Sequence, residues 1–138
     1  MTEATLRLPT ELSALEYMHP KQLEFFRQAV EGMLIRLIAR MELASDSVTK
    51  TLDGVGDEVD RAALETEAFN ARASFGAQSK EIASLRRALV LMSDGRYGWC
   101  QITGDEIGLE RLCVMPQATT TVHAQQRRER VQAMHACY

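Results

Sequence analysis

The fold of this chain is decided by residues 53–60, which read DGVGDEVD. Gly54 and Gly56 interrupt any helical pattern and allow the chain to reverse its direction. Asp57 is suited to be the N-cap of a following helix, because its carboxylate can accept hydrogen bonds from the free N–H groups of the first turn. Long stretches with few helix breakers lie on both sides. We therefore expect two helices that run antiparallel.

The helix before this turn is expected from Pro20 to about residue 49. Pro20 fits a first helical position, where its missing N–H costs nothing. Apolar residues then recur at alternating spacings of three and four, which is typical of a seam along one helix face. The seam positions are Leu23, Phe26, Val30, Met33, Leu37, Met41, Ala44 and Val48. Such a face requires an apolar partner.

The helix after the turn is expected from Asp57 to Ser93, with Gly95 as its C-terminal cap. Its seam positions are Val59, Ala62 or Ala63, Phe69, Ala73, Phe75, Ile82, Leu85, Leu89 and Met92. Two such helices predict a long antiparallel coiled-coil hairpin, with a shared length of about 40 Å at a rise of 1.5 Å per residue.

Glycine and proline become frequent after Asp94, which indicates a boundary. The expected parts are an N-terminal segment (1–19) that packs on a head, the hairpin (20–94) with its tip at about 50–60, and the head itself (95–138). A C-terminal helix is expected within the head from Ala118 to about His135. Thr10 is expected to cap a short helix in the N-terminal segment. The fold class is all-α.

Composition excludes several classes of function. The 138 residues are 46% hydrophobic and 25% charged, which is typical of a folded soluble chain. The net charge of −3 argues against direct DNA binding. The 3 cysteines argue against a disulfide-stapled secreted module and favour the cytoplasm. No apolar run is long enough to cross a membrane, and no nucleophile, P-loop or zinc-protease motif indicates an enzyme.

Acidic residues gather around the turn, at Asp53, Asp57, Glu58, Asp60, Glu65 and Glu67, against the one basic residue Arg61. Helix capping, compensation of the helix dipole and solvation explain this composition without any function. The alternative is that a rod with carboxylates at its tip enters a basic or metal-containing cavity of a partner, where charge-assisted contacts are strong.

The stretch 57–63, DEVDRAA, resembles the tip motif of DksA/TraR-family transcription factors, which bind bacterial RNA polymerase. The resemblance extends over about residues 16–130. It includes EYM at 16–18, QLEFFR at 22–27, YGWC at 97–100, EIGLERL at 106–112 and Pro116. It implies a monomer whose coiled coil enters the secondary channel of the polymerase, with Asp57, Asp60 and Ala62 as the functional tip residues near the catalytic Mg²⁺.

The resemblance also implies an effect on promoters. A regulator of this kind changes the stability of open promoter complexes, inhibits ribosomal RNA promoters and activates amino-acid biosynthesis promoters together with guanosine tetraphosphate (ppGpp). Family members supply basic residues to the ppGpp site, yet the matching positions here are Ser84, Met115 and Gln125. The neighbouring Arg86, Arg87, Arg127 and Arg128 are the candidates to supply this charge, or they form a solvated face.

Most family members hold zinc with four cysteines in the head. The matching positions here are Cys100, Thr103, Thr121 and Ala124, so three ligands are missing and no structural zinc is expected. The resemblance is therefore strongest to zinc-independent paralogues. Packing is then expected to hold the head together, through core residues at Tyr97, Trp99, Ile107, Leu109, Leu112 and Val114.

Two alternatives remain open. The first is a structural or adaptor protein whose hairpin dimerises through its seam or binds another protein. The second is a metal sensor that uses Cys100, Cys113 and His123 in a rearranged site.

Overall fold

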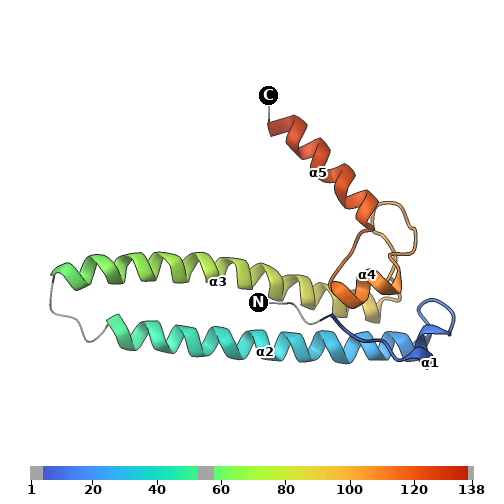
Figure 1. Ribbon diagram of the computed structural model, residues 1–138, viewed down its shortest axis with the longest axis horizontal. Coiled ribbons are helices and arrows are strands. Elements are labelled where there is room, and N and C mark those ends of the chain that lie inside the picture. Colours follow the sequence, from blue (N-terminus) through green and yellow to red (C-terminus); the bar gives the residue numbers. More distant parts are fainter. Residues whose placement is uncertain (1–4, 53–57, 137–138) are drawn as a thin grey trace. The chain divides into compact units, whose positions relative to one another are not determined.

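The computed structural model describes residues 5–52 and 58–136, with side chains described outside 47–60. Its helices are α1 (Thr10–Ser13), α2 (Pro20–Leu52), α3 (Glu58–Ser93), α4 (Leu109–Val114) and α5 (Val122–Ala136) (Figure 1). Within this part of the chain there is no strand, only an isolated antiparallel bridge between Trp99 and Glu106. The predicted all-α class is therefore confirmed. None of the described helices combines the length and apolarity needed to cross a membrane.

The chain forms two compact units. The head unit contains Met1–Glu31 and Arg87–Tyr138, and the hairpin unit contains Gly32–Arg86. Each long helix contributes one end to the head unit. The limits inferred from sequence, at 19/20 and 94/95, remain a prediction.

In the hairpin unit, α2 and α3 lie side by side and run antiparallel (Figure 1). The expected seam of α2 continues through Leu37, which is buried, and through Met33 and Met41, which are half-buried. Ala44 is exposed, so the seam of α2 does not extend to it. Val48, like the turn itself, lies outside the described side chains.

The seam of α3 differs from the prediction in its middle. Phe69 is 71% exposed, and Ala62, Ala63 and Ala73 are exposed as well. Besides Glu81 and Ser84, the less exposed positions between residues 64 and 85 are Leu64, Ala68, Ala71, Phe75, Gln78, Ile82 and Leu85. They alternate by four and three without interruption, which is the spacing of a continuous coiled-coil seam. The prediction was wrong because it favoured the large Phe69 over the small Ala68 and Ala71, although spacing and not size decides which side chain faces the partner helix.

The core of the head unit forms where α2 begins and α3 ends. Phe26 and Val30 of α2 are completely buried, as is Leu112 of α4. The rings of Phe26 and Tyr97 lie 6.0 Å apart, and the Tyr97 hydroxyl donates to the carbonyl oxygen of Pro116 at 2.6 Å. This bond satisfies the one polar group that a buried tyrosine brings into a core.

The expected head core is confirmed at Tyr97, Ile107 and Leu112, all of which are buried. It is wrong at Val114, which is 55% exposed at the last position of the short α4. Trp99 is also partly exposed, at 36%. Leu109, which begins α4, is half-buried.

Hydrogen bonds between residues close in sequence fix the start of α2. At the start of α2, the N–H of Lys21 donates to Nδ1 of His19, and the N–H of His19 donates to Oε1 of Gln22, a reciprocal cap. Gln22 also donates to the carbonyl oxygen of Leu12, which joins α1 to α2.

At the end of α3, Gly95 adopts a φ of 74°, and the N–H of Arg96 donates to the carbonyl oxygen of Leu91 at 2.9 Å. These features confirm Gly95 as the C-terminal cap. Thr10 does not cap α1 as expected, because it is the first residue inside the helix and Pro9 occupies the N-cap position. The C-terminal helix begins at Val122 and not at Ala118, which is buried in the preceding loop.

Candidate functional site: the hairpin tip and the head

The structure describes the predicted tip residues only in part. Asp57 lies outside the described residues. Asp60 lies in the first turn of α3, but its side chain is not among those described. Ala62 is exposed in the next turn, where its carbonyl oxygen accepts a hydrogen bond from the hydroxyl of Thr66 at 3.1 Å. The role of these residues therefore stays a prediction.

The head carries a loop, residues 98–107, that we call the knuckle loop. The N–H of Cys100 donates to the carbonyl oxygen of Asp105 at 2.7 Å, and the N–H of Gly104 donates back to the carbonyl oxygen of Cys100 at 2.9 Å. The N–H of Ile107 donates to the carbonyl oxygen of Gly98 at 2.9 Å and closes the loop. Backbone hydrogen bonds thus define this loop without any metal ligand.

The four positions that match the zinc ligands of the family lie close to one another. The thiol of Cys100 accepts hydrogen bonds from the side chain and backbone of Thr103 and from the backbone N–H groups of Ile102 and Thr121. The Oγ1 of Thr121 accepts a hydrogen bond from the N–H of Ala124 at 3.1 Å. The knuckle loop is therefore joined to the start of α5 by hydrogen bonds at the place where the family motif puts its ligands.

These hydrogen bonds change the acidity of Cys100. Its burial alone would raise the pKa, because a thiolate loses hydration in the protein interior. The donors of Thr103, Ile102 and Thr121 outweigh this effect and lower the pKa of Cys100 to about 6. Cys113, which is also buried, shows the opposite behaviour, since burial raises its pKa.

The residues at these positions do not fit a structural zinc ion. Such an ion requires about four thiolate or imidazole ligands, whereas Cys100 is accompanied here by two hydroxyls and a methyl group. Across the part of the chain that the structure describes, no group of three or more His, Cys, Asp or Glu side chains could hold a metal ion. The rearranged site at Cys100, Cys113 and His123 is therefore not formed.

The arginines considered for ppGpp binding lie at the surface. Arg86, Arg87, Arg127 and Arg128 are all exposed. At the positions where the resemblance implies basic residues, Ser84 donates its hydroxyl to the carbonyl oxygen of Lys80 at 3.0 Å, and Met115 is 37% exposed. Gln125 is engaged by the guanidinium of Arg111. No described contact brings the four arginines together.

Sequence reasoning missed the contacts of Tyr17. Its hydroxyl donates to the carbonyl oxygen of Gly98 and accepts from the N–H of Gly108 at 3.0 Å, so it joins the two ends of the knuckle loop. The N–H of Leu6 donates to the carbonyl oxygen of Cys113 at 2.9 Å. The N-terminal segment thus contacts the head at two places. The motif EYM drew attention to Tyr17 as a family feature, but nothing in the sequence indicated its partners.

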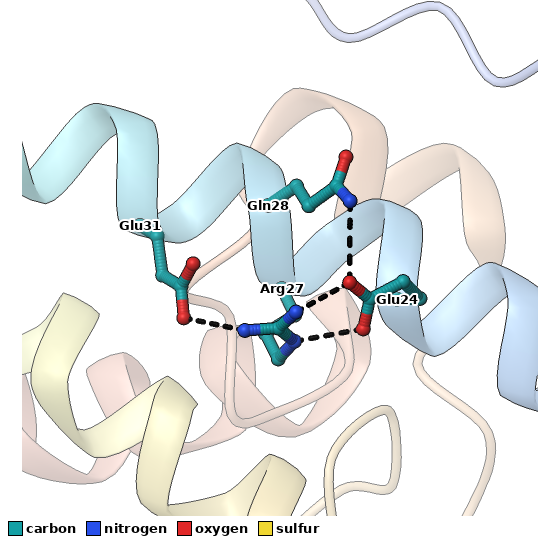
Figure 2. Close-up of polar contacts among 4 residues, drawn as sticks. All are labelled: Glu24, Arg27, Gln28 and Glu31. Atoms are coloured by element: carbon teal, nitrogen blue, oxygen red, sulfur yellow. Dashed lines mark hydrogen bonds and ion pairs between the residues drawn. The ribbon is translucent and has the colours of Figure 1, made fainter.

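A charged cluster on the first turns of α2 does not form a site (Figure 2). Arg27 donates to Glu24 and, at 2.7 Å, to Glu31, while Gln28 donates to Glu24 at 3.2 Å. The hydrogen bond from Arg27 lowers the pKa of the Glu24 carboxyl. These side chains are about half exposed and spaced as neighbours along one helix, so the cluster is a solvated ion-pair stripe.

The fold and the knuckle loop define the class of proteins that carry a coiled-coil hairpin on a zinc-finger-like head. A sequence model described as "Prokaryotic dksA/traR C4-type zinc finger" matches residues 95–130. The "RNA polymerase-binding transcription factor DksA" of Caulobacter vibrioides (strain NA1000 / CB15N) is 34% identical over 119 residues, which cover 86% of this chain and 84% of that protein. The chain therefore belongs to the DksA/TraR family.

Other relatives agree with this assignment. The protein of the same name from Escherichia coli (strain K12) is 30% identical over 103 residues, 75% of this chain and 68% of that protein. The solved structure of transcription factor DksA2 from Pseudomonas aeruginosa has a TM-score of 0.81 and 30% identity, and the match covers 89% of this chain and 96% of that one. A structure from Chlamydia trachomatis, with a TM-score of 0.53 and 20% identity, shares the fold.

The comparisons confirm the resemblance inferred from sequence and the predicted coiled-coil fold with a zinc-finger-like head. They also confirm that the chain is no enzyme, because the proteins of this family are transcription factors.

Proposed function

We propose that this protein binds bacterial RNA polymerase directly and regulates transcription. The observation that carries the proposal is the match to a polymerase-binding factor of Caulobacter, which spans most of both chains. The hairpin and the tip motif DEVDRAA at 57–63 support it, since they provide a narrow rod with carboxylates near its end. The rod enters the secondary channel, and the polymerase performs all the chemistry.

The tip acts after the protein has docked. Asp57 and Asp60 lie near the catalytic Mg²⁺ and the mobile elements around it, and Ala62 follows them on α3. Binding that favours one state of the polymerase–promoter complex shifts its population by the difference in affinity. Promoters with short-lived open complexes respond most, so ribosomal RNA promoters are inhibited and amino-acid biosynthesis promoters are activated.

The proposal includes cooperation with ppGpp at the polymerase interface. Ser84, Met115 and Gln125 bear no positive charge, so the charge has to come from neighbours. Arg127 and Arg128 of α5 and Arg86 and Arg87 of α3 are exposed and available for phosphate contacts.

The protein works without zinc, as a monomer and without direct contact to DNA. The support for zinc independence is the ligand set, in which two hydroxyls and a methyl group stand beside Cys100. The support for the absence of direct DNA binding is the net charge of −3.

The test measures binding to core RNA polymerase in a metal-chelated buffer, together with repression of a ribosomal RNA promoter. Wild type is compared with Asp60→Asn and with the matched control Glu67→Gln, an exposed carboxylate of α3 outside the motif. We expect all three proteins to bind and only Asp60→Asn to lose repression.

Absence of binding by wild type would refute the proposal. If sedimentation also found a concentration-dependent dimer, the protein would instead be an adaptor that pairs through its seam. Equal loss of repression in Asp60→Asn and Glu67→Gln would show that general acidity, and not the motif, is responsible.

A further inference from the structure

The side of α3 that lies opposite its seam carries a second set of regularly spaced residues. Each of them lies two positions before a residue of the seam, and two residues turn a helix by about 200°. All of them are exposed, and their spacings of four and three repeat those of the seam. We call this set the outer face of α3, and it consists of Ala62, Thr66, Phe69, Ala73 and Gly76.

The outer face carries no charge, although an exposed helix face is normally polar or charged. Thr66 has its one polar side chain, and that hydroxyl donates to the carbonyl oxygen of Ala62 at 3.1 Å, within the helix itself. A Cβ atom at Gly76 would meet no described atom within 4 Å. The outer face therefore offers an open and uncharged surface to a partner.

Phe69 is the one large side chain of the outer face. It is 71% exposed, so most of its apolar surface is free to be buried by a partner. A single exposed phenylalanine among charged residues would need no explanation. In the middle of an uncharged face, however, Phe69 has the arrangement of an anchor residue, and the burial of a few such residues supplies most of the affinity of an interface.

The outer face begins inside the tip motif. Ala62 belongs to the stretch DEVDRAA and is one of the predicted functional residues of the tip. Phe69 follows two helical turns later, on the same side of α3 and about 10 Å further from the tip. A surface of the polymerase that contacts Ala62 can therefore extend over Phe69 without any rotation of the hairpin.

The proposed function requires a surface of this kind. Asp57 and Asp60 act there after docking, so the affinity has to come from other residues. We propose that the outer face of α3 is a docking surface of the hairpin and that Phe69 anchors it on an apolar part of the polymerase. The inference rests on the proposed function and names the residues that supply binding.

The first experiment measures the affinity of the whole protein for core RNA polymerase. Phe69→Ala is compared with Leu43→Ala, which removes a side chain that is 70% exposed on α2. We expect Phe69→Ala to weaken binding by about tenfold, mainly through faster dissociation, and Leu43→Ala by less than about twofold. The loss should be the same at low and at high salt, because screening acts on charges and not on an apolar contact.

A second pair of variants adds a charge without removing an apolar anchor. Ala73→Glu places a carboxylate on the outer face, and Ser74→Glu places one at the next position, which is exposed but outside this face. Both variants change the net charge equally. We expect Ala73→Glu to weaken binding by at least about tenfold, because docking would strip the carboxylate of its water. Ser74→Glu should bind like wild type.

Repression of a ribosomal RNA promoter separates docking from the action of the tip. An increased concentration of Phe69→Ala should restore full repression, because only its affinity is reduced. The same increase should not restore repression by Asp60→Asn, in which the tip itself is altered. Circular dichroism of each variant confirms that the helices are intact.

Equal affinities of wild type, Phe69→Ala and Ala73→Glu would overturn the inference, as would equal losses in Phe69→Ala and Leu43→Ala. A dimer of this chain that Phe69→Ala dissociates, together with unchanged polymerase binding, would show that the outer face pairs two copies instead. The proposed function would survive these results, since wild type would still bind the polymerase. Absence of binding by wild type would refute the proposed function itself.

Discussion

The rings of Tyr17 and Trp99 meet edge to face, with centroids 5.3 Å apart and planes inclined by 86°. This pair joins the segment before α2 to the knuckle loop, and the hydroxyl of Tyr17 adds hydrogen bonds to Gly98 and Gly108. Aromatic pairs of this geometry contribute about 0.5–1.5 kcal/mol beyond the burial of their area. Such contacts hold the knuckle loop in place.

The hydroxyl of Tyr17 can be removed without changing the ring. Tyr17→Phe leaves the contact with Trp99 and deletes the hydrogen bonds to Gly98 and Gly108. We expect the free energy of unfolding to fall by about 1–3 kcal/mol, since part-buried partners lose their bonds. Urea denaturation followed by Trp99 fluorescence measures this. Ser13→Ala, which removes an exposed hydrogen bond, is the control and should change stability by under about 0.5 kcal/mol. Equal effects of the two variants would contradict the assigned role.

Gly98 permits the close approach of the N-terminal segment. Its φ is 90°, and a Cβ atom at this position would lie 2.6 Å from Sδ of Met18. Gly104 has a similar φ of 78° but no neighbour within 4 Å of such a Cβ atom. In both alanine variants the positive φ destabilises the fold by about 1 kcal/mol, because a residue with a Cβ atom rarely adopts it. Only Gly98→Ala adds a steric clash. We expect Gly98→Ala to lower the thermal midpoint more than Gly104→Ala does, and identical midpoints would show that Met18 moves aside freely.

The acidity of Cys100 predicts a pH dependence of stability. Its pKa of about 6 in the folded state lies below that of a cysteine in an unfolded chain, about 8.5. A group whose pKa is lowered by folding contributes its full stabilisation at a pH above the pKa that it has in the unfolded chain. This stabilisation is lost as the pH falls through the pKa that the group has in the folded protein. The free energy of unfolding of wild type should therefore rise between about pH 6 and pH 9, relative to Cys100→Ser.

Cys113→Ser is the matched control for this experiment, because burial raises the pKa of Cys113 and its thiol stays neutral over most of this range. Its stability should follow the wild-type pH profile. Parallel profiles for wild type and Cys100→Ser would show that Cys100 is not ionised near neutral pH.

The two phenylalanines of α3 should respond differently to truncation. Phe69 is 71% exposed, whereas Phe75 lies half-buried in the seam. We expect Phe75→Ala to cost at least about 1–2 kcal/mol of stability and Phe69→Ala about 0.5 kcal/mol or less. Thermal unfolding followed by circular dichroism gives both values. A larger cost at Phe69 would restore the seam inferred from sequence.

Chelation tests whether folding depends on a metal. Because the ligand set does not fit zinc, excess chelator should leave the circular-dichroism spectrum and the thermal midpoint of wild type unchanged. A four-cysteine relative treated in the same way serves as the positive control. A large fall in the midpoint of wild type would show that metal binding and folding are coupled.

The sequence alone predicted the all-α class, the two long helices and the cap at Gly95, because helix breakers and the spacing of apolar residues act locally. It also led to the family, since the tip motif and the head motifs occur at a matching separation. The seam of α3 was wrong in its middle because alanine and phenylalanine are both compatible with a helix. The spacing places Ala68 and not Phe69 on the face toward α2, and the exposure of Phe69 in the structure shows it.

Only the tertiary structure shows which contacts hold the parts of the head together. The bonds from Tyr17 to the knuckle loop and from Arg111 to Gln125 join residues that are separated by 81 and 14 positions in the chain. No periodicity connects residues so far apart. The lost cysteines could be read from the sequence, whereas the contacts that join the N-terminal segment and α5 to the rest of the head exist only where folding brings distant donors and acceptors within hydrogen-bond distance.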